Sequence, residues 1–309
     1  MKRFLADDDL SPAQQAQVLE LAARLKRTPY DARPLEGPRT VAMIFDKPTL
    51  RTQSSFAAGI AELGGYPMLV DGTLAGIGKR ESVADVARVL GRQASLIVWR
   101  TYEQARIDEM AEYAGVPVVN ALTDDFHPCQ LLADLQTVRE HKGELPGLRV
   151  AFVGDGACNM GNSWLLAGAT AGMHVVVGAP EDYRPAAEMF ERARRIGAET
   201  GGSVDAVTDP REAVEGADVV VTDTWVSMGK EEEEAEARRR IFAPYQVTAQ
   251  LMELAKPDAI VQHCLPAYRG AEIEADVIDG PQSVVWDEAE NRRHAQKAII
   301  HFLMDVDDG

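Results

Sequence analysis

The chain alternates short apolar runs with helical stretches, and this alternation limits its fold more than any other feature of the sequence. In the first half, the apolar runs comprise residues 41–45, 68–70, 96–99 and 116–119. These runs have the length of strands and are too apolar for strands with one face in water, so they predict a buried sheet. Helical spacing occurs between them, as at Val83, Val86, Ala87 and Leu90. Strands and helices in alternation indicate parallel βαβ units.

A second series of the same kind follows a break in the pattern. Its apolar runs comprise residues 150–153, 174–177, 218–222 and 259–262. The segment KGELPG at residues 142–147 separates the two series, and a final helix is expected from about Asp287. The sequence therefore predicts an α/β protein with two doubly wound parallel-sheet domains joined by helices. The domains comprise residues 1–141 and residues 142–286.

Composition argues against two classes of protein. Among the 309 residues, 49 acids oppose 32 bases, which gives a formal net charge of −17. Proteins that bind nucleic acid need a basic surface for the phosphates, so we expect no nucleic-acid partner. We also expect no membrane partner, because no stretch approaches the roughly 18 apolar residues of a membrane span.

The cysteines and the first residues bear on location. Cys129, Cys158 and Cys264 are odd in number and widely spaced, so a disulfide framework is not expected. The first residues, MKRFLADDDLSPAQQ, lack the apolar core of a signal peptide. Both features predict a cytoplasmic protein.

Ligands of open parallel sheets bind beyond the carboxyl ends of the strands, so the residues after each strand are candidates for a site. After residues 41–45 the sequence reads DKPTLRTQSSF, which places Thr49 and Thr52 on either side of Arg51. Backbone N–H groups at the start of a helix attract anions, and a guanidinium adds bidentate bonds to phosphate oxygens. The turn suits a phosphate group, and the plain alternative is a capped helix start with an exposed arginine.

Three further candidates follow the next strands. Arg100 comes directly after residues 96–99, and His127 and Gln130 open the helix predicted over residues 127–141. A histidine can hydrogen-bond a carbonyl oxygen, and a glutamine amide can recognise an NH₂ group. A surface arginine and a structural histidine are the ordinary alternatives at these positions.

Cys264 lies in the segment QHCLPA after the last predicted strand. It is either a thiol that contacts a ligand or a small buried residue, which is the commoner fate of a free cysteine. A dinucleotide site is a competing interpretation for residues 150–161, VAFVGDGACNMG. The glycine spacing there is wrong, and Ala179 and Pro180 stand where a ribose-binding acid would follow, so NAD binding is not expected.

The chain resembles the aspartate/ornithine carbamoyltransferase family over nearly its whole length. The resemblance lies in four features in this order: the turn at residues 46–56, Arg100, the helix start with His127 and Gln130, and the segment QHCLPA. Two further segments are similar to its ornithine branch: DTWVSMG at residues 223–229 and EAENRRHAQKA at residues 288–298. The resemblance implies transfer of a carbamoyl group from carbamoyl phosphate to the δ-amine of L-ornithine. The products would be L-citrulline and phosphate, in arginine biosynthesis or a related pathway.

The resemblance also implies an architecture. The first domain would bind carbamoyl phosphate, the second would bind ornithine, and the C-terminal helix (residues 287–309) would pack back on the first domain. Family members usually form homotrimers, which can stack into larger assemblies. In the trimer a loop, here residues 72–82, reaches into the neighbour's site. The resemblance implies neither a metal nor an organic cofactor.

Residue roles carry over from the family by motif position. Carbamoyl phosphate would be bound by Thr49, Leu50, Arg51, Thr52, Gly76, Arg100, His127, Gln130, Cys264, Leu265 and Arg292. Ornithine would be bound by Asn159, Asp223, Ser227 and Met228. The resemblance makes Arg100, His127 and Cys264 catalytic: the first two would face the carbonyl oxygen, and the thiol would lie beside the attacking amine.

Several positions depart from the family pattern. Leu50 and Gln53 remove a hydroxyl and a positive charge from the phosphate turn, and Gly76 replaces a glutamine of the loop. Cys158 stands where the first of two asparagines is usual. Three hypotheses follow: weak donor binding with retained ornithine turnover, a toxin-insensitive variant with a reshaped phosphate pocket, or a paralogue with another acceptor amine. A non-catalytic binding paralogue is a fourth.

Overall fold

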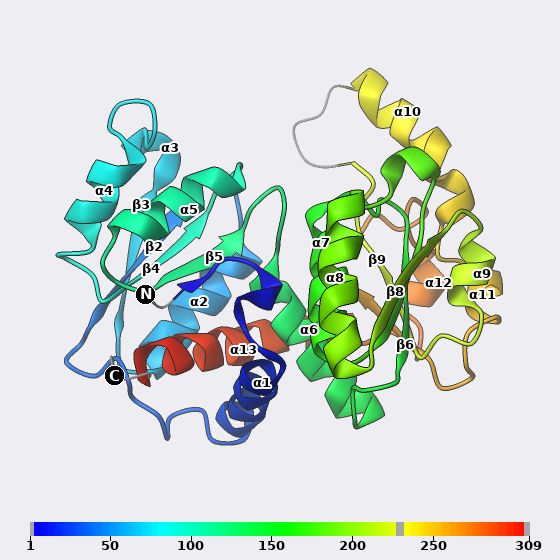
Figure 1. The fold of residues 1–309 in the computed structure, drawn as a ribbon, viewed down its shortest axis with the longest axis horizontal. Coiled ribbons are helices and arrows are strands. Elements are labelled where there is room, and N and C mark those ends of the chain that lie inside the picture. The colour runs from blue at the N-terminus through cyan, green and yellow to red at the C-terminus, as the bar shows by residue number, and fades with distance from the viewer. Residues whose placement is uncertain (1–2, 227–231, 306–309) are drawn as a thin grey trace. The chain divides into compact units, whose positions relative to one another are not determined.

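The computed structural model describes residues 3–226 and 232–305. The chain forms two compact units, each built on a five-stranded parallel sheet (Figure 1). The first unit comprises the described residues up to Gln136 and those from Glu290 onward, and the second comprises the described residues of Thr137–Ala289. Two parallel sheets with interleaved helices confirm the predicted α/β class.

The first unit has its strands in the order β1-β5-β4-β2-β3. The strands are β1 (Arg3–Phe4), β2 (Thr40–Phe45), β3 (Tyr66–Asp71), β4 (Leu96–Arg100) and β5 (Val118–Leu122). The chain runs outward from β2 to β3 and then returns past β2 to β4. Because crossovers between parallel strands are right-handed, this reversal puts the connecting helices on opposite faces of the sheet.

The helices of the first unit follow this rule. α2 (Arg51–Glu62) lies on one face of the sheet, and α4 (Val83–Leu90) and α5 (Gln104–Tyr113) cover the other (Figure 1). The face under α4 and α5 buries Ile44 and Trp99. Shorter elements are η1 (Asp7–Asp9) and α3 (Gly72–Ala75).

α1 (Pro12–Arg27) has a start that its sequence encodes. The Ser11 hydroxyl accepts from the backbone N–H of Gln14 at 3.3 Å, and the Gln14 side chain accepts from the backbone N–H of Ser11 at 2.9 Å. This reciprocal pair satisfies two donors that a helix start leaves open, and proline fits the first helical position.

The last helix, α13 (Val285–Asp305), returns to the first unit from Glu290 onward. Its Lys297 is fully buried and donates to Glu62 Oε2 of α2 at 2.6 Å and to the Pro29 carbonyl at 2.5 Å. A buried ammonium needs such partners, because leaving it without them is strongly destabilising. Packing of the C-terminal helix on the amino-terminal unit is therefore confirmed.

The second unit repeats the arrangement with the order β10-β9-β6-β7-β8. Its strands are β6 (Arg149–Val153), β7 (His174–Gly178), β8 (Ser203–Val207), β9 (Val219–Thr222) and β10 (Ile260–His263). Its helices are α7 (Asn159–Thr170), η2 (Glu181–Tyr183), α8 (Ala187–Thr200), α9 (Pro210–Val214), α10 (Glu232–Phe242), η3 (Ala243–Tyr245), α11 (Ala249–Met252) and α12 (Ala275–Ile278). α6 (Pro128–Lys142) contributes its last residues to this unit.

One prediction about the strands is wrong. Residues 68–70 were expected in a buried strand, yet β3 is an edge strand, with Leu69 56% exposed and Met68 and Val70 half-buried. An edge strand is covered by a neighbour on one side only, so an apolar sequence does not ensure burial there.

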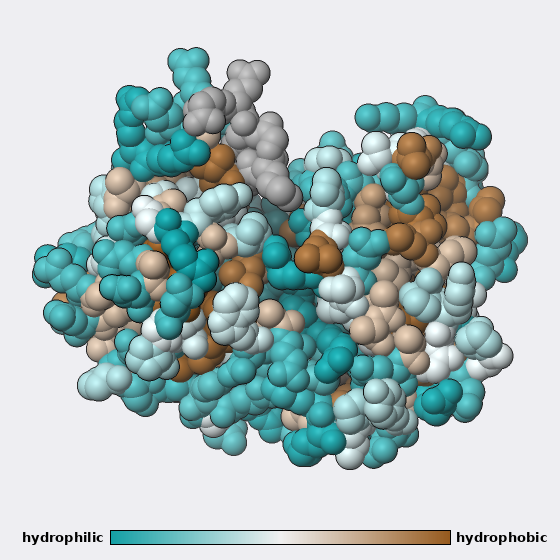
Figure 2. Space-filling model, turned by 180° about the vertical axis from the view of Figure 1, so that it is seen from behind, coloured by the Kyte–Doolittle hydropathy of each residue, from teal (hydrophilic) through white to brown (hydrophobic). Residues whose placement is uncertain are grey.

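Apolar side chains gather on this exposed edge of the first unit, over β3 and α3 (Figure 2). Tyr66 and Leu69 of β3 are each 56% exposed, and Leu74 of α3 is 81% exposed. Contiguous exposed apolar surface beside an open sheet edge is typical of a surface that pairs with another molecule. Among residues 3–226 and 232–305, no helix is long and apolar enough to span a membrane.

Candidate active site

Both sheets contain a reversal of strand order, and ligands of open α/β sheets bind in the crevice at such a reversal. In the first unit the reversal lies between β2 and β4, and in the second it lies between β6 and β9. Arg100 ends β4, and Asp223 directly follows β9. One cluster of predicted site residues is built on each of these strand ends.

The phosphate turn of the first unit leads from β2 into α2, which begins at Arg51. Thr49 and Arg51 are half-buried, and Thr52 is 1% exposed. Leu50 is 78% exposed and makes no side-chain cap for the helix. The structure thus buries the predicted hydroxyl of Thr52 and leaves the unusual leucine on the surface of the unit.

Two guanidinium groups converge on the Thr52 hydroxyl. Arg100 Nη1 donates to Thr52 Oγ1 at 3.3 Å, and Arg292 Nη2 donates to the same oxygen at 3.0 Å. Arg292 is 2% exposed, so its charge is largely removed from water. Two convergent arginines at a helix start form a place for a multiply charged anion, because guanidinium donors match phosphate oxygens in pairs.

Gln130 and His127 adjoin this arginine pair. Arg292 Nη1 donates to Gln130 Oε1 at 2.5 Å, and Gln130 Nε2 donates to Asp134 Oδ1 at 2.8 Å. Both residues are buried on the first turn of α6 or directly before it. The structure therefore brings together Thr52, Arg100, His127, Gln130 and Arg292, as the sequence predicts.

Burial lowers the pKa of His127 well below its ordinary value of 6.5, and the charges of Arg292, Arg100 and Arg51 lower it further. The imidazole is therefore neutral around pH 7 and carries one N–H donor and one acceptor nitrogen. A neutral histidine beside arginines can donate a hydrogen bond to a carbonyl oxygen without adding another charge.

The lowered pKa predicts a pH dependence of stability. As the pH falls through 6.5, His127 becomes protonated in the unfolded chain but stays neutral in the folded protein. The free energy of unfolding should therefore decrease. Because one imidazole takes up one proton, the loss should not exceed about 1.4 kcal/mol per pH unit. His127→Gln should remove this contribution, which urea unfolding at pH 7.5, 6.5 and 5.5 would measure. His174→Gln, at a half-buried position of β7, is the matched control. Equal pH slopes for wild type and His127→Gln would refute the prediction.

Asp46, directly after β2, forms hydrogen bonds that link the end of β2 to the residue after β4 and to α5. Its Oδ2 accepts from Thr101 Oγ1 at 2.6 Å and from Arg106 Nη1 at 2.9 Å. Arg106 Nη2 in turn donates to the Ile77 carbonyl at 2.7 Å. These bonds tie the segment after α3 to the ends of β2 and β4. Sequence reasoning gave no role to Asp46 or Arg106, because their partners lie far away in the sequence.

Gly76, a predicted donor-binding residue, ends α3 with a φ of 65°. That left-handed conformation suits glycine, because a side chain there would be strained. Gly76 precedes Ile77 and therefore lies on the segment that Arg106 holds. Its place is a turn beside the strand ends, and it does not belong to the Thr52 cluster.

The second cluster centres on Asp223. Asp223 Oδ1 accepts from the backbone N–H of Thr224 at 2.7 Å and from Cys264 Sγ, after β10, at 3.2 Å. Burial raises the pKa of the Cys158 thiol well above its ordinary value, and Asp223 and Asp155 raise it further. The structure thus brings Asp223 and Cys264 together, and Cys158 lies close enough for the Asp223 charge to raise the pKa of its thiol.

His263 was not a predicted site residue, yet it shapes the turn that carries Cys264 and Leu265. Its Nδ1 accepts from the Leu265 N–H at 2.9 Å, and its Nε2 faces Glu272 Oε1 at 3.1 Å. Leu265 has a φ of 56°, a left-handed conformation that bulky residues rarely adopt. The bond from Leu265 to His263 holds that conformation at the candidate site.

Asp223, His263 and Cys264 each bring a possible metal-ligand atom within 4.8 Å of the others. The His263 ring is occupied, however: its Nδ1 lone pair accepts from Leu265, and its Nε2 proton is directed at Glu272. A ring with both nitrogens engaged offers no lone pair to a cation. The two remaining ligands are fewer than the three or four protein ligands of zinc sites.

Besides Asp223, the predicted ornithine-binding residues are Asn159, Ser227 and Met228. Asn159 is the first residue of α7, directly after Cys158, and is half-buried. Ser227 and Met228 lie outside the described residues.

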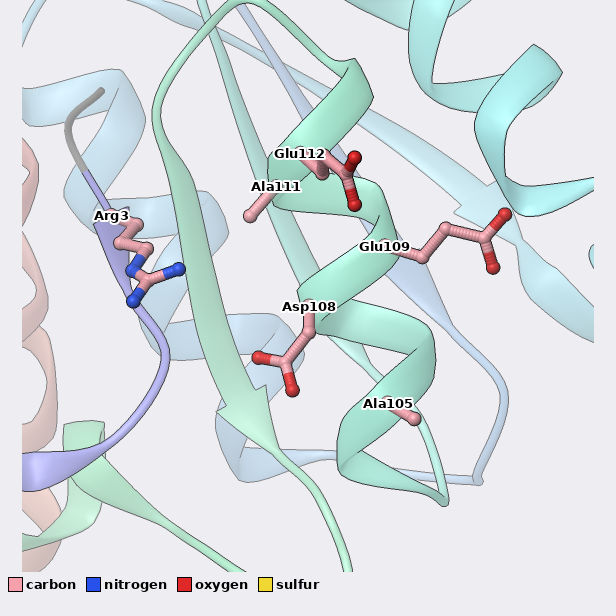
Figure 3. A pocket seen from close by; sticks show the side chains of 6 residues that line it. All are labelled: Arg3, Ala105, Asp108, Glu109, Ala111 and Glu112. Carbon is pink, nitrogen blue, oxygen red and sulfur yellow. The ribbon is translucent and has the colours of Figure 1, made fainter.

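One open hollow of the first unit lies apart from these clusters, between β1 and α5 (Figure 3). Its lining comprises Arg3, Ala105, Asp108, Glu109, Ala111 and Glu112. Three carboxylates against one guanidinium would repel a phosphate ester, so this hollow does not suit an anionic ligand.

The fold and the two clusters define a class: a two-unit α/β protein with an anion site of converging arginines in one unit and an aspartate–cysteine pair in the other. Family models agree with this division. Residues 2–140 match the model described as aspartate/ornithine carbamoyltransferase, carbamoyl-P binding domain, and residues 146–303 match that described as its Asp/Orn binding domain. The chain belongs to the aspartate/ornithine carbamoyltransferase family.

Individual relatives fall in the ornithine branch. A protein of Clavibacter michiganensis named ornithine carbamoyltransferase is 61% identical over 303 residues, which cover 98% of each chain. One of Mycolicibacterium paratuberculosis with the same name is 57% identical over 304 residues, again 98% of each chain. The solved ornithine carbamoyltransferase of Pyrococcus furiosus superposes with a TM-score of 0.95 at 44% identity, covering 99% of this chain and 98% of that one.

Proposed function

We propose that this protein transfers the carbamoyl group of carbamoyl phosphate to the δ-amine of L-ornithine, giving L-citrulline and phosphate. The observation that carries the proposal is the cluster in which Arg100 and Arg292 converge on buried Thr52 beside the neutral His127. That cluster supplies charge for a phosphate and an uncharged donor for a carbonyl oxygen. Relatives named ornithine carbamoyltransferase, among them one 61% identical over 303 residues, support the choice of acceptor.

The residues of the first unit would bind the donor. In this proposal the phosphate is held by Thr49, Arg51, Thr52, Arg100 and Arg292 and by backbone N–H groups at the start of α2. Leu50 contributes main chain only, since its side chain is exposed. Gln130 reads the carbamoyl nitrogen.

The chemistry follows from where charge develops. Attack on the carbonyl carbon places negative charge on the carbonyl oxygen, and donors fixed in advance around that oxygen stabilise it. Arg100 and His127 supply those donors. The carbon–oxygen bond to phosphate then breaks, and the attacking nitrogen gives up one proton to the departing phosphate or to water. Phosphate leaves readily because arginines already neutralise it.

The residues of the second unit would bind the acceptor. Asp223 would take the α-ammonium group of ornithine, and Asn159 its α-carboxylate region. The family resemblance also assigns Ser227 and Met228 to ornithine. Cys264 and the Leu265 backbone would lie beside the δ-amine and the carbamoyl group. The δ-amine must be neutral to attack, and removal from water together with nearby cations favours that form.

The proposal extends to assembly and setting. The exposed apolar edge formed by Tyr66, Leu69 and Leu74 supports association with other copies of the chain. The family resemblance makes that assembly a homotrimer, in which residues 72–82 of one copy, Gly76 among them, would reach the neighbour's donor site. The trimers could stack further. The proposal also places the enzyme in the cytoplasm, in arginine biosynthesis or a related pathway.

The direct test is a stoichiometric product assay. Purified protein with carbamoyl phosphate and L-ornithine should release citrulline and phosphate in equal amounts. Phosphate release without citrulline would mean that the donor is hydrolysed and would exclude the transfer.

The altered phosphate turn predicts a weakened donor site that can be repaired. The double variant Leu50→Thr, Gln53→Arg should lower the KM for carbamoyl phosphate about tenfold, because one bond to a charged group is worth about 1.5–3 kcal/mol. Steady-state kinetics at saturating ornithine measure the change. Ser54→Arg adds the same charge one residue along the helix and is the control. A KM that is unchanged or higher in the double variant would show that the turn is not a weakened phosphate site.

The same departures favour a second possibility within the family. A turn in which Leu50 supplies no hydroxyl and Gln53 no positive charge could exclude phosphate analogues bulkier than the donor, which would make the enzyme a toxin-insensitive variant. An acceptor other than ornithine is the remaining alternative, and a solved N-acetyl-L-ornithine transcarbamylase is related at 31% identity. A non-catalytic binding paralogue is disfavoured, because such a protein has little use for the carbonyl-directed Arg100 and His127.

A further inference from the structure

The orientation of the Gln130 amide decides what its ligand must offer. A glutamine side chain ends in a carbonyl oxygen that accepts hydrogen bonds and an NH₂ group that donates them, and the two ends have nearly the same size and shape. Turned one way, the side chain recognises a ligand N–H. Turned the other way, it recognises a ligand oxygen.

Two buried groups fix this orientation from opposite sides. Arg292 Nη1 donates to Gln130 Oε1 at 2.5 Å, and Asp134 Oδ1 accepts from Gln130 Nε2 at 2.8 Å. Reversal would set NH₂ against a guanidinium and a carbonyl oxygen against a carboxylate, so both contacts would become repulsive. Gln130, Arg292 and Asp134 are 1%, 2% and 0% exposed, so water cannot readily relieve such a mismatch.

Asp134 owes its position to the helix. It follows Gln130 by four residues on α6, the spacing that places two side chains on the same face of a helix. Asp134 therefore accepts a hydrogen bond from the amide nitrogen of Gln130. Arg292 donates to the amide oxygen and also to the hydroxyl of Thr52 in the phosphate turn.

We propose that Asp134 is a positioning residue that makes the donor site select a carbamoyl group. The inference rests on the proposed function and deepens it. Held by Asp134, Gln130 presents its carbonyl oxygen, whose second lone pair can accept an N–H from the donor's NH₂ group. The methyl group of acetyl phosphate has nearly the same size and no proton to donate, so it loses that bond. A site built around such a bond rejects the analogue that lacks it.

The test compares the dissociation constants of carbamoyl phosphate and acetyl phosphate by calorimetry without an acceptor. Asp134→Leu removes the acceptor for the Gln130 amide at similar volume, so the preference for carbamoyl phosphate should fall at least tenfold. Asp134→Asn keeps an oxygen that can accept and should retain the preference within threefold. Thr137→Val, at another fully buried position of α6, is the control for loss of a buried polar group.

A merely structural role predicts a different pattern. If Asp134→Leu weakens the binding of carbamoyl phosphate and acetyl phosphate equally, their ratio stays at the wild-type value and the positioning role is wrong. If Asp134→Leu does not fold, Asp134→Ala takes its place, with an expected loss of at least threefold and the same opposing outcomes. Failure of the wild type to bind carbamoyl phosphate would overturn the proposed function as well, which distinguishes the two claims.

Discussion

Replacing Arg100 by leucine should lower kcat/KM for carbamoyl phosphate about 10³-fold or more. Arg100 is the last residue of β4, and its guanidinium donates to Thr52 Oγ1 at 3.3 Å. It therefore lies where the phosphate and the carbonyl oxygen would both be bound. Loss of one fixed donor to a developing oxyanion costs about 10²–10³ in rate. Loss of its bond to the phosphate adds about 1.5–3 kcal/mol.

Two further variants make the Arg100 result specific. Arg100→Lys keeps the charge and loses the planar fork, so its kcat/KM should lie between those of the wild type and the leucine variant. Arg92→Leu removes an exposed arginine of the same unit and should have little effect. Steady-state citrulline formation measures all three. An Arg100→Leu enzyme within tenfold of wild type would contradict the role given to this residue.

Asp223→Asn should lower kcat/KM for ornithine about 100-fold and leave the dissociation constant of carbamoyl phosphate unchanged. Asparagine keeps the size of the side chain and removes the charge that would pair with the α-ammonium group of ornithine. Bonds between charged groups are worth about 1.5–3 kcal/mol, or roughly ten- to 150-fold. The affinity for carbamoyl phosphate should be kept, because the residues proposed to hold its phosphate, on β4, α2 and α13, belong to the other unit.

The matched control is Asp205→Asn, which removes an exposed carboxylate from β8 of the same sheet and should be silent. Kinetics with varied ornithine, combined with calorimetric titration of carbamoyl phosphate, separate the two substrates. A parallel loss of donor affinity in Asp223→Asn, or an unchanged kcat/KM for ornithine, would contradict the assignment of Asp223 to the acceptor.

The central strands of both sheets could be predicted from the sequence because parallel strands buried on both faces are apolar throughout. The edges could not be. β1 has two residues, too few for any periodicity, and β8 carries the exposed Ser203 and Asp205. The exposure of β3 depends on having no strand beyond it, which is a property of the sheet order and not of the strand's own residues.

The site was predictable where local sequence determines position. Arg100 ends β4 and Cys264 directly follows β10, and their selection as candidates follows from the rule that parallel sheets bind ligands at their carboxyl ends. Asp223 directly follows β9, but only the family resemblance singled it out. Arg292 is different, because it is 240 residues from Thr52 and meets it only in the folded chain. Only the resemblance of its segment to a known family singled it out.

Supporting residues were missed for the same physical reason. Arg106 donates to the carbonyl of Ile77, and His263 accepts from the N–H of Leu265. Such bonds go to main-chain groups of turns, so no pairing of residue types in the sequence reveals them. Asp134 has an ordinary place on a helix and gains its meaning from the Gln130 and Arg292 side chains beside it.

The central claim is that carbamoyl phosphate and ornithine are the substrates, and an acceptor panel tests it most directly. The measurement is kcat/KM with carbamoyl phosphate and each of L-ornithine, N-acetylornithine, putrescine and lysine. Ornithine should exceed N-acetylornithine and putrescine at least 100-fold, because Asp223 would bind an α-ammonium group that putrescine lacks and acetylation neutralises. It should exceed lysine about tenfold or more, because one extra methylene group costs about 1–3 kcal/mol. A preference for another amine, or no turnover with any of them by correctly folded protein, would contradict the account.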